Sequence, residues 1–195
     1  AKETIYVPKF IFTEQRRDPV ETRPLHIGEN EVAIFEGIHA LNSDVCGHGE
    51  GKNATKVYIS ARSNIEEDGV VFKGTWIRIL RRAIRDRQFR GTSPAETFGM
   101  WENLRRGEKK YISPHKNSAD VIFDSSLQYE VSVLKTFADG LFDGIRENVP
   151  RYNEIMKLRD ALELFEPLSA DYLPPTSLIR EFIGGLEYNG DVNLL

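Results

Sequence analysis

The segment RILRRAIRDRQFRG, residues 78–91, carries six arginines and one acidic residue, Asp86. Apolar residues recur in and just before it at steps of three and four, the spacing of an amphipathic helix. These residues are Trp76, Ile79, Leu80, Ala83 and Ile84. The pattern therefore predicts a helix that begins near Thr75. Steps of three, four and seven also relate four of the arginines, so we expect most of them to project from one side. They are Arg78, Arg81, Arg82 and Arg85.

This concentration of positive charge needs an explanation, because like charges at helical spacing repel each other. Phosphate groups would remove the repulsion, and guanidinium groups bind phosphate with well-matched geometry. The alternative is a solvated helix face paired with distant acids, of which the chain has 30. Arg90 and Gly91 place a further arginine on a turn just past the helix. The helix, turn and following helix thus resemble a lid that closes over phosphates.

The segments on either side of this helix indicate an α/β protein with a mainly parallel sheet. Strands are predicted in residues 4–13, 31–37, 56–60, 119–124 and 128–134. Further helices are predicted in residues 38–45, 94–107, 135–148, 152–168 and 174–185. Residues 14–24 are polar and rich in turn-forming residues. Pro8 is expected at a strand edge or bulge, and Asp68 with Gly69 at a turn.

Length and composition exclude several classes of protein. A chain of 195 residues is sufficient for one domain with a substantial core. Its apolar runs are too short to span a membrane, and a single cysteine excludes an internal disulfide framework and favours a cytoplasmic location. The pI of about 5.7 makes bulk binding to nucleic acid unfavourable, so the arginine cluster is a local feature.

Two other motifs fail on closer reading. CGHGEGKN, residues 46–53, resembles a P-loop, but Cys46 replaces its first glycine and Asn53 its final Ser or Thr, and the segment precedes a strand. Cys46 and His48 have no partners at the spacing of a metal site. Trp101 with the basic residues that follow could clamp a nucleic acid, but we favour an aromatic side chain that anchors the second lid helix to the body.

Glu36 follows the predicted buried strand in AIFEGI. An acid at the carboxyl end of such a strand lies where α/β folds bind ligands, and it could hold Mg²⁺ beside a nucleotide. The alternative is an acid that caps the next helix.

Together, IFEGIHALN and residues 78–135 resemble the uridine kinase and phosphoribulokinase superfamily, in particular its larger bacterial uridine kinase-like branch. The resemblance spans nearly the whole chain, and its most specific part is strand-FEG followed by RRxxRDxxxRG. It implies a P-loop NTPase-like, three-layer fold and an ATP- and Mg²⁺-dependent kinase that phosphorylates a nucleoside or a related small-molecule acceptor.

The resemblance also implies roles for individual residues. Glu36 would help hold Mg²⁺, Arg82 would lie near the acceptor, and Arg85 and Arg90 would reach the ATP phosphates. Uridine kinases have P-x-Y-D-F at the acceptor site, where this chain has PKFIF. Phe10 thus replaces the tyrosine and Ile11 the aspartate.

Two further positions depart from uridine kinases: Gln15 replaces a histidine, and Thr92 an arginine. Phe10 and Gln15 could still contact an acceptor, but uridine itself is in doubt. The P-loop and the catalytic base of the family would lie upstream of residue 1. We therefore expect a single kinase-like domain that is incomplete at its N-terminus and has little kinase activity alone. Its parts would be acceptor-site strands in residues 1–36, a core with the arginine lid in 37–118, and C-terminal strands and helices in 119–195.

Two alternatives to the kinase remain. One is a non-catalytic nucleotide- or RNA-binding module derived from a kinase, which the acidic pI makes less favourable. The other is a scaffold that forms homo-oligomers through the helix predicted in residues 152–168.

Overall fold

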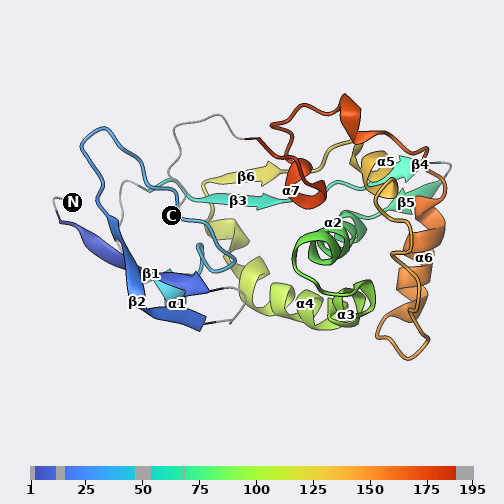
Figure 1. Cartoon of the computed structure of the whole chain (residues 1–195), viewed down its shortest axis with the longest axis horizontal. Coiled ribbons are helices and arrows are strands. Elements are labelled where there is room, and N and C mark those ends of the chain that lie inside the picture. The colour runs from blue at the N-terminus through green and yellow to red at the C-terminus, as the bar shows by residue number, and fades with distance from the viewer. Residues whose placement is uncertain (1–2, 12–15, 47–53, 68, 188–195) are drawn as a thin grey trace. The chain divides into compact units, whose positions relative to one another are not determined.

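The computed structural model describes residues 3–11, 16–46, 54–67 and 69–187 (Figure 1). The described residues form two compact units, one up to Ala40 and one from Leu41 onward. Each unit is described by itself below. The division into a single domain with three consecutive parts stays a prediction.

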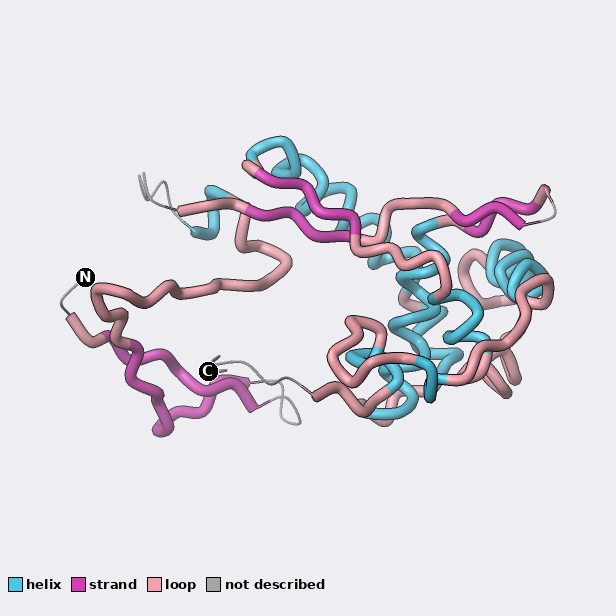
Figure 2. The backbone as a smooth tube through the Cα atoms, turned by 90° about the horizontal axis from the view of Figure 1, so that it is seen from above, coloured by secondary structure: helices cyan, strands magenta, loops and turns pink. Residues whose placement is uncertain are grey.

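The first unit contains an antiparallel pair of strands, β1 (Ile5–Ile11) and β2 (Arg16–Leu25), which run side by side in Figure 2. The register shifts between Pro8 and Phe10, which confirms the predicted bulge at Pro8. The turn-rich reading of residues 14–24 is wrong for β2. Backbone pairing with β1 and a Lys9–Glu21 ion pair of 2.7 Å between the strands support an extended conformation that local propensity did not favour.

The buried parallel strand predicted in residues 31–37 is not formed. Residues 31–36 have no helix or strand, and Val32, Ile34 and Phe35 are 88%, 83% and 72% exposed. A buried parallel strand needs a hydrogen-bonded neighbour and cover on both faces, and no described strand pairs with this segment. The apolar sequence alone therefore does not produce a strand here.

The second unit contains the parallel pair β3 (Val57–Ser60) and β6 (Val121–Asp124), and the hairpin of β4 (Ile65–Glu67) and β5 (Val70–Phe72). The hairpin confirms the predicted turn, where Gly69 has a φ of +74°. A mixed α/β class is confirmed. The mainly parallel sheet is not, because only one of the three strand pairs in the described residues is parallel and β3 is not fully buried.

The central helix of the second unit is α2 (Gly74–Phe89), which packs against α3, α5 and α7 (Figure 1). Ile77, Leu80 and Ile84 of α2 are fully buried in the core. The other helices are α1 (Ser43–Cys46), α3 (Pro94–Gly99), α4 (Trp101–Gly107), η2 (Glu108–Ile112), η3 (Ser113–Ser118), α5 (Glu130–Lys135), α6 (Tyr152–Leu162), η4 (Ala170–Tyr172) and α7 (Arg180–Ile183).

Several helix predictions are confirmed. The arginine-rich helix is α2, and Pro94 opens α3, where the Ser93 hydroxyl accepts from the backbone N–H of Glu96 in a capping box. The predicted amphipathic helix in residues 152–168 is α6. None of the helices in the described residues is long and apolar enough to cross a membrane.

Two predictions in the C-terminal third are wrong. Residues 128–134 alternate like a strand but form α5, in which Glu130 and Leu134, one helical turn apart, are both buried. In the helix predicted for residues 135–148, only Lys135 is helical, as the last residue of α5, and residues 136–148 form turns and irregular structure. Gly140 and Gly144 interrupt this segment with φ values of +64° and +73°, which an α-helix does not contain.

Candidate functional site

Three arginines at the C-terminal end of α2 converge on Asp86. The Asp86 carboxylate is 4% exposed, and its oxygens lie 3.3 Å from Arg82 Nε, 3.0 Å from Arg85 Nη2 and 3.5 Å from Arg90 Nη1. Helical spacing explains the arrangement, since Arg82 precedes Asp86 by four residues and Arg90 follows it by four. Gly91, with a φ of +63°, then turns the chain, and the Asp86 carbonyl accepts from the N–H groups of Arg90 and Thr92.

One carboxylate does not neutralise three guanidinium groups, so the cluster keeps an excess of two positive charges. Burial lowers the pKa of the Arg82 guanidinium, Asp86 raises it in part, and Arg85 and Arg90 lower it again. Arg82 Nε is buried and donates no hydrogen bond, despite its proximity to Asp86. An anion with several oxygens would supply the negative charge that the cluster lacks. We call these four residues, Arg82, Arg85, Asp86 and Arg90, the Asp86 cluster.

The other arginines of α2 do not share this position, contrary to the expectation that most would project from one side. Arg78 pairs with Glu108 at 2.5 Å, and Arg81 with Glu130 at 2.6 Å. These acids lie 30 and 49 residues further along the chain. For Arg78 and Arg81, pairing with distant acids is therefore the correct reading. Arg87 donates to the backbone carbonyls of residues 137 and 139.

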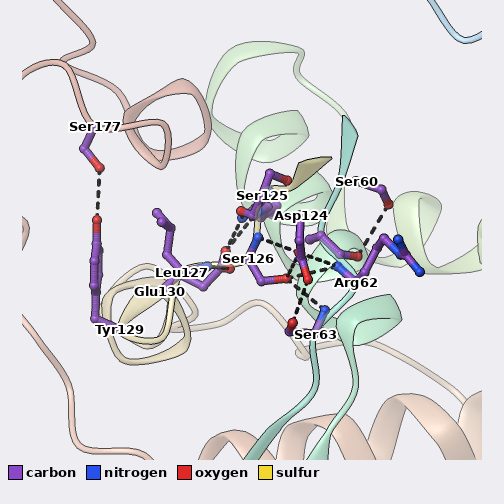
Figure 3. Close-up of polar contacts among 12 residues, drawn as sticks. Ser60, Arg62, Ser63, Asp124, Ser125, Ser126, Leu127, Tyr129, Glu130 and Ser177 are labelled. Atoms are coloured by element: carbon purple, nitrogen blue, oxygen red, sulfur yellow. Dashed lines mark hydrogen bonds and ion pairs between the residues drawn. The ribbon is translucent and has the colours of Figure 1, made fainter. Parts of the chain in front are cut away.

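A second polar group lies at the carboxyl ends of the parallel strands β3 and β6 (Figure 3). Asp124 accepts hydrogen bonds from the Ser63 hydroxyl at 2.6 Å, the Ser126 hydroxyl at 2.7 Å and the backbone N–H groups of Arg62 and Ser126. Partial desolvation would raise the pKa of the Asp124 carboxyl, but these hydrogen bonds outweigh it and hold the pKa well below the ordinary value. Asp124 thus fastens the segment after β3 to the segment after β6.

The remaining predicted site residues lie in the first unit or outside the described residues. Phe10 is in β1, opposite Arg17, and its side chain is not described. Gln15 lies outside the described residues. Glu36 is exposed, in a segment without helix or strand. Phe10 and Glu36 belong to the first unit and Arg82, Arg85 and Arg90 to the second, so the substrate and metal roles stay predictions.

The structure also bears on the rejected motifs. Residues 47–53 of the P-loop-like segment lie outside the described residues. Among the residues that the structure describes, no three His, Cys, Asp or Glu side chains form a group that could hold a metal ion. Trp101 is 2% exposed, and the Arg151 guanidinium lies 5.4 Å from its ring centre. Trp101 therefore anchors α4 to the body of the unit, as predicted.

Sequence reasoning missed three polar features of the second unit. It noted Asp86 only as an offsetting charge, although its four-residue spacing to Arg82 and Arg90 could have indicated a shared partner. It missed Asp124, whose signal is an acid directly after the apolar strand in ADVIFD. The pairing of Glu130 with Arg81 has no comparable local signal.

Comparison with known proteins points to one family. Neither the curated proteins nor the solved structures gave a match to the chain. The sequence profile described as "Phosphoribulokinase / Uridine kinase family" matches residues 2–132, which is more than half of the chain and includes α2 and the whole Asp86 cluster. This is a family of P-loop kinases, and the resemblance inferred from FEG and RRxxRDxxxRG is confirmed. The chain belongs to the phosphoribulokinase and uridine kinase family.

Proposed function

We propose that the chain forms the acceptor-and-lid part of an ATP-dependent kinase that transfers the γ-phosphate to a hydroxyl group of a nucleoside-like small molecule. Arg85 and Arg90 contact the ATP phosphates, and Arg82 lies near the acceptor. The observation that supports this most directly is the convergence of these three guanidinium groups on the single carboxylate of Asp86.

The charge of the Asp86 cluster suits phosphoryl transfer. Catalysis of this reaction depends mainly on positioning and on neutralising the negative charge of the phosphoryl oxygens. Arg90 has the longest contact to Asp86, 3.5 Å, and is 53% exposed, so it can exchange this contact for a phosphate oxygen at little cost. Arg85 is 19% exposed and held at 3.0 Å, which gives the cluster a more rigid donor.

The acceptor and metal assignments rest on the family resemblance. Phe10 and Gln15 would contact the acceptor, and Glu36 would help hold Mg²⁺. A carboxylate oxygen suits Mg²⁺, but Glu36 would supply one protein ligand, and no cluster of acids beside it completes a site within the described residues. Mg²⁺ usually keeps several waters and binds substrate phosphates, so one carboxylate is compatible with this role. When bound, the ion would neutralise phosphate charge.

The proposal is tested by measuring Mg²⁺-dependent transfer from ATP to a panel of nucleosides with the full-length gene product. Arg85→Ala and Arg90→Ala should each lower kcat by about 10³-fold or more, the range for loss of an arginine that stabilises the transferred phosphate. Arg159→Ala is the matched control, because Arg159 is an exposed α6 arginine paired with the neighbouring Asp160 at 2.8 Å. Turnover in the Arg85 and Arg90 variants equal to that of the control would refute the lid assignment.

The 195-residue chain should itself turn over little ATP, since it contains no G-x-x-x-x-G-K-[ST] motif to cradle the β- and γ-phosphates. Measured beside the full-length product, the chain alone should show at most a trace of the activity. Full activity of the chain alone would contradict this part of the proposal.

A further inference from the structure

A second basic site lies at the opposite end of α2. It is a cleft of about 840 Å³ in the second unit, between β3, the first turn of α2, α4 and η2. This volume lies in the range of small-molecule binding sites. Basic side chains dominate its lining, eight against the two acids Glu102 and Glu108, which leaves an excess of six positive charges. The basic residues are Arg62, Lys73, Arg78, Arg105, Arg106, Lys109, Lys116 and Arg151.

The two acids neutralise only part of this charge. Glu108 accepts from Arg78 at 2.5 Å and from Arg105 at 2.6 Å, so one carboxylate holds two arginines. Glu102 pairs with Arg151 at 3.0 Å. Five cations form no ion pair in the part of the chain that the structure describes. They are Arg62, Lys73, Arg106, Lys109 and Lys116.

The N-terminus of α2 opens into the same cleft through Gly74 and Thr75. Gly74 N–H donates to the Asn64 side chain, but Thr75 N–H has no acceptor among the described residues. The residue before the helix is Lys73, whose side chain does not cap it, and the first turn contains no acid. A helix N-terminus favours negative charge, so a lysine at this position opposes the helix dipole. A bound anion would offset the positive charge of both Lys73 and the helix N-terminus.

We propose that this cleft binds a small, multiply phosphorylated molecule of nucleotide size, at a site separate from the Asp86 cluster. Thr75 and Asp86 lie eleven residues apart, or about 16 Å along the axis of α2. Arg62, Arg106 and Lys109 are exposed and form no ion pair among the described residues, so they can move onto phosphate oxygens, although Arg106 would first release the Asn103 side chain at 2.8 Å. Glu108 meanwhile holds Arg78 and Arg105 in place. The net charge of −4 of the whole chain makes binding of a long nucleic acid less favourable than binding of a compact anion in this cleft.

The test is a calorimetric titration of the 195-residue chain with inorganic tripolyphosphate. It is carried out in an Arg85→Ala/Arg90→Ala background, so that the Asp86 cluster contributes little to the signal. Adding Arg62→Ala, Arg106→Ala and Lys109→Ala should weaken binding about tenfold or more for each cation that contacts the anion, because each contact is a hydrogen bond between charged groups. Adding Arg159→Ala instead should leave the affinity unchanged.

The outcomes separate the cleft from the proposed kinase site. Binding that survives Arg85→Ala/Arg90→Ala and is lost with the three cleft cations supports the proposal, whether or not Arg85 and Arg90 prove necessary for turnover. Loss of binding already in the Arg85→Ala/Arg90→Ala background, or no effect of the three cleft substitutions, would overturn it. Tighter binding of a short oligouridylate than of tripolyphosphate would also overturn it, in favour of a nucleic-acid site. Arg62, Arg106 and Lys109 are exposed, so circular dichroism should show that adding their substitutions leaves the fold unchanged.

Discussion

The ion pair between Arg81 and Glu130 gives the sharpest prediction of stability, because both residues are buried. Glu130 is fully buried and Arg81 is 6% exposed. Glu130 Oε2 accepts from Arg81 Nε at 2.6 Å, and Oε1 accepts from the backbone N–H of Leu127 at 2.8 Å. Arg81 also donates to the Ser125 carbonyl and lies 5.0 Å from the Phe182 ring centre. The pair therefore joins α2 to α5 and to the segment after β6.

Glu130→Gln should cost about 3 kcal/mol of unfolding free energy. Breaking a buried ion pair by removing one partner typically costs about 3–5 kcal/mol, because a charge stays buried without its partner. We expect the lower end, since the Ser125 carbonyl and the Phe182 ring remain beside the guanidinium. At a urea dependence of about 1–3 kcal/mol per molar, the midpoint of unfolding should fall by about 1–3 M.

Urea unfolding followed by tryptophan fluorescence measures this effect in the second unit, because both tryptophans of the chain, Trp76 and Trp101, lie there. Asp160→Asn is the matched control. It breaks the exposed Arg159–Asp160 pair and should cost less than about 1 kcal/mol. The double variant Arg81→Met/Glu130→Met removes both charges and should cost less than Glu130→Gln alone. A Glu130→Gln protein no less stable than the control would refute the reasoning.

Two further predictions concern residues that contact Arg62 and Ser63, in the segment after β3. Gly74→Ala should destabilise the chain by about 1–3 kcal/mol, because a Cβ there would lie 3.0 Å from backbone atoms of Arg62 and Ser63. Gly107→Ala, in helical backbone with open space around it, should instead stabilise by about 0.5–1 kcal/mol, and urea midpoints that shift alike in both variants would contradict this. The lowered pKa of Asp124 adds stability that is present above the ordinary value of 3.8 and is lost as the pH falls below it. Urea midpoints at about pH 3 and pH 5 should therefore differ more in the native chain than in Asp124→Asn, and an equal difference would exclude this role.

Local sequence patterns correctly predicted the elements whose structure depends mainly on neighbouring residues. The apolar spacing of Trp76 to Ile84 predicts α2, and Pro94 after Ser93 predicts the start of α3, because amphipathic spacing and capping are short-range effects. The same kind of pattern gave a wrong prediction where a contact with a residue far along the chain accompanies the observed secondary structure. Alternation in residues 128–134 suggested a strand, but burial of Glu130 against Arg81, 49 residues away, accompanies a helix there.

The arginines of α2 show the same limit at the level of single side chains. Successive helical residues are about 100° apart around the axis, so Arg81 and Arg82 necessarily diverge. Arg81 enters the core because Glu130 meets it there, whereas the partly exposed Arg82 lies beside the buried carboxylate of Asp86. Counting arginines in RRAIRD therefore cannot separate a structural guanidinium from one available to a ligand. The difference is made by acids elsewhere in the chain: Glu130 holds Arg81 in the core, and Glu108 holds Arg78 together with Arg105. Asp86, shared among three arginines, leaves charge for an anion to neutralise.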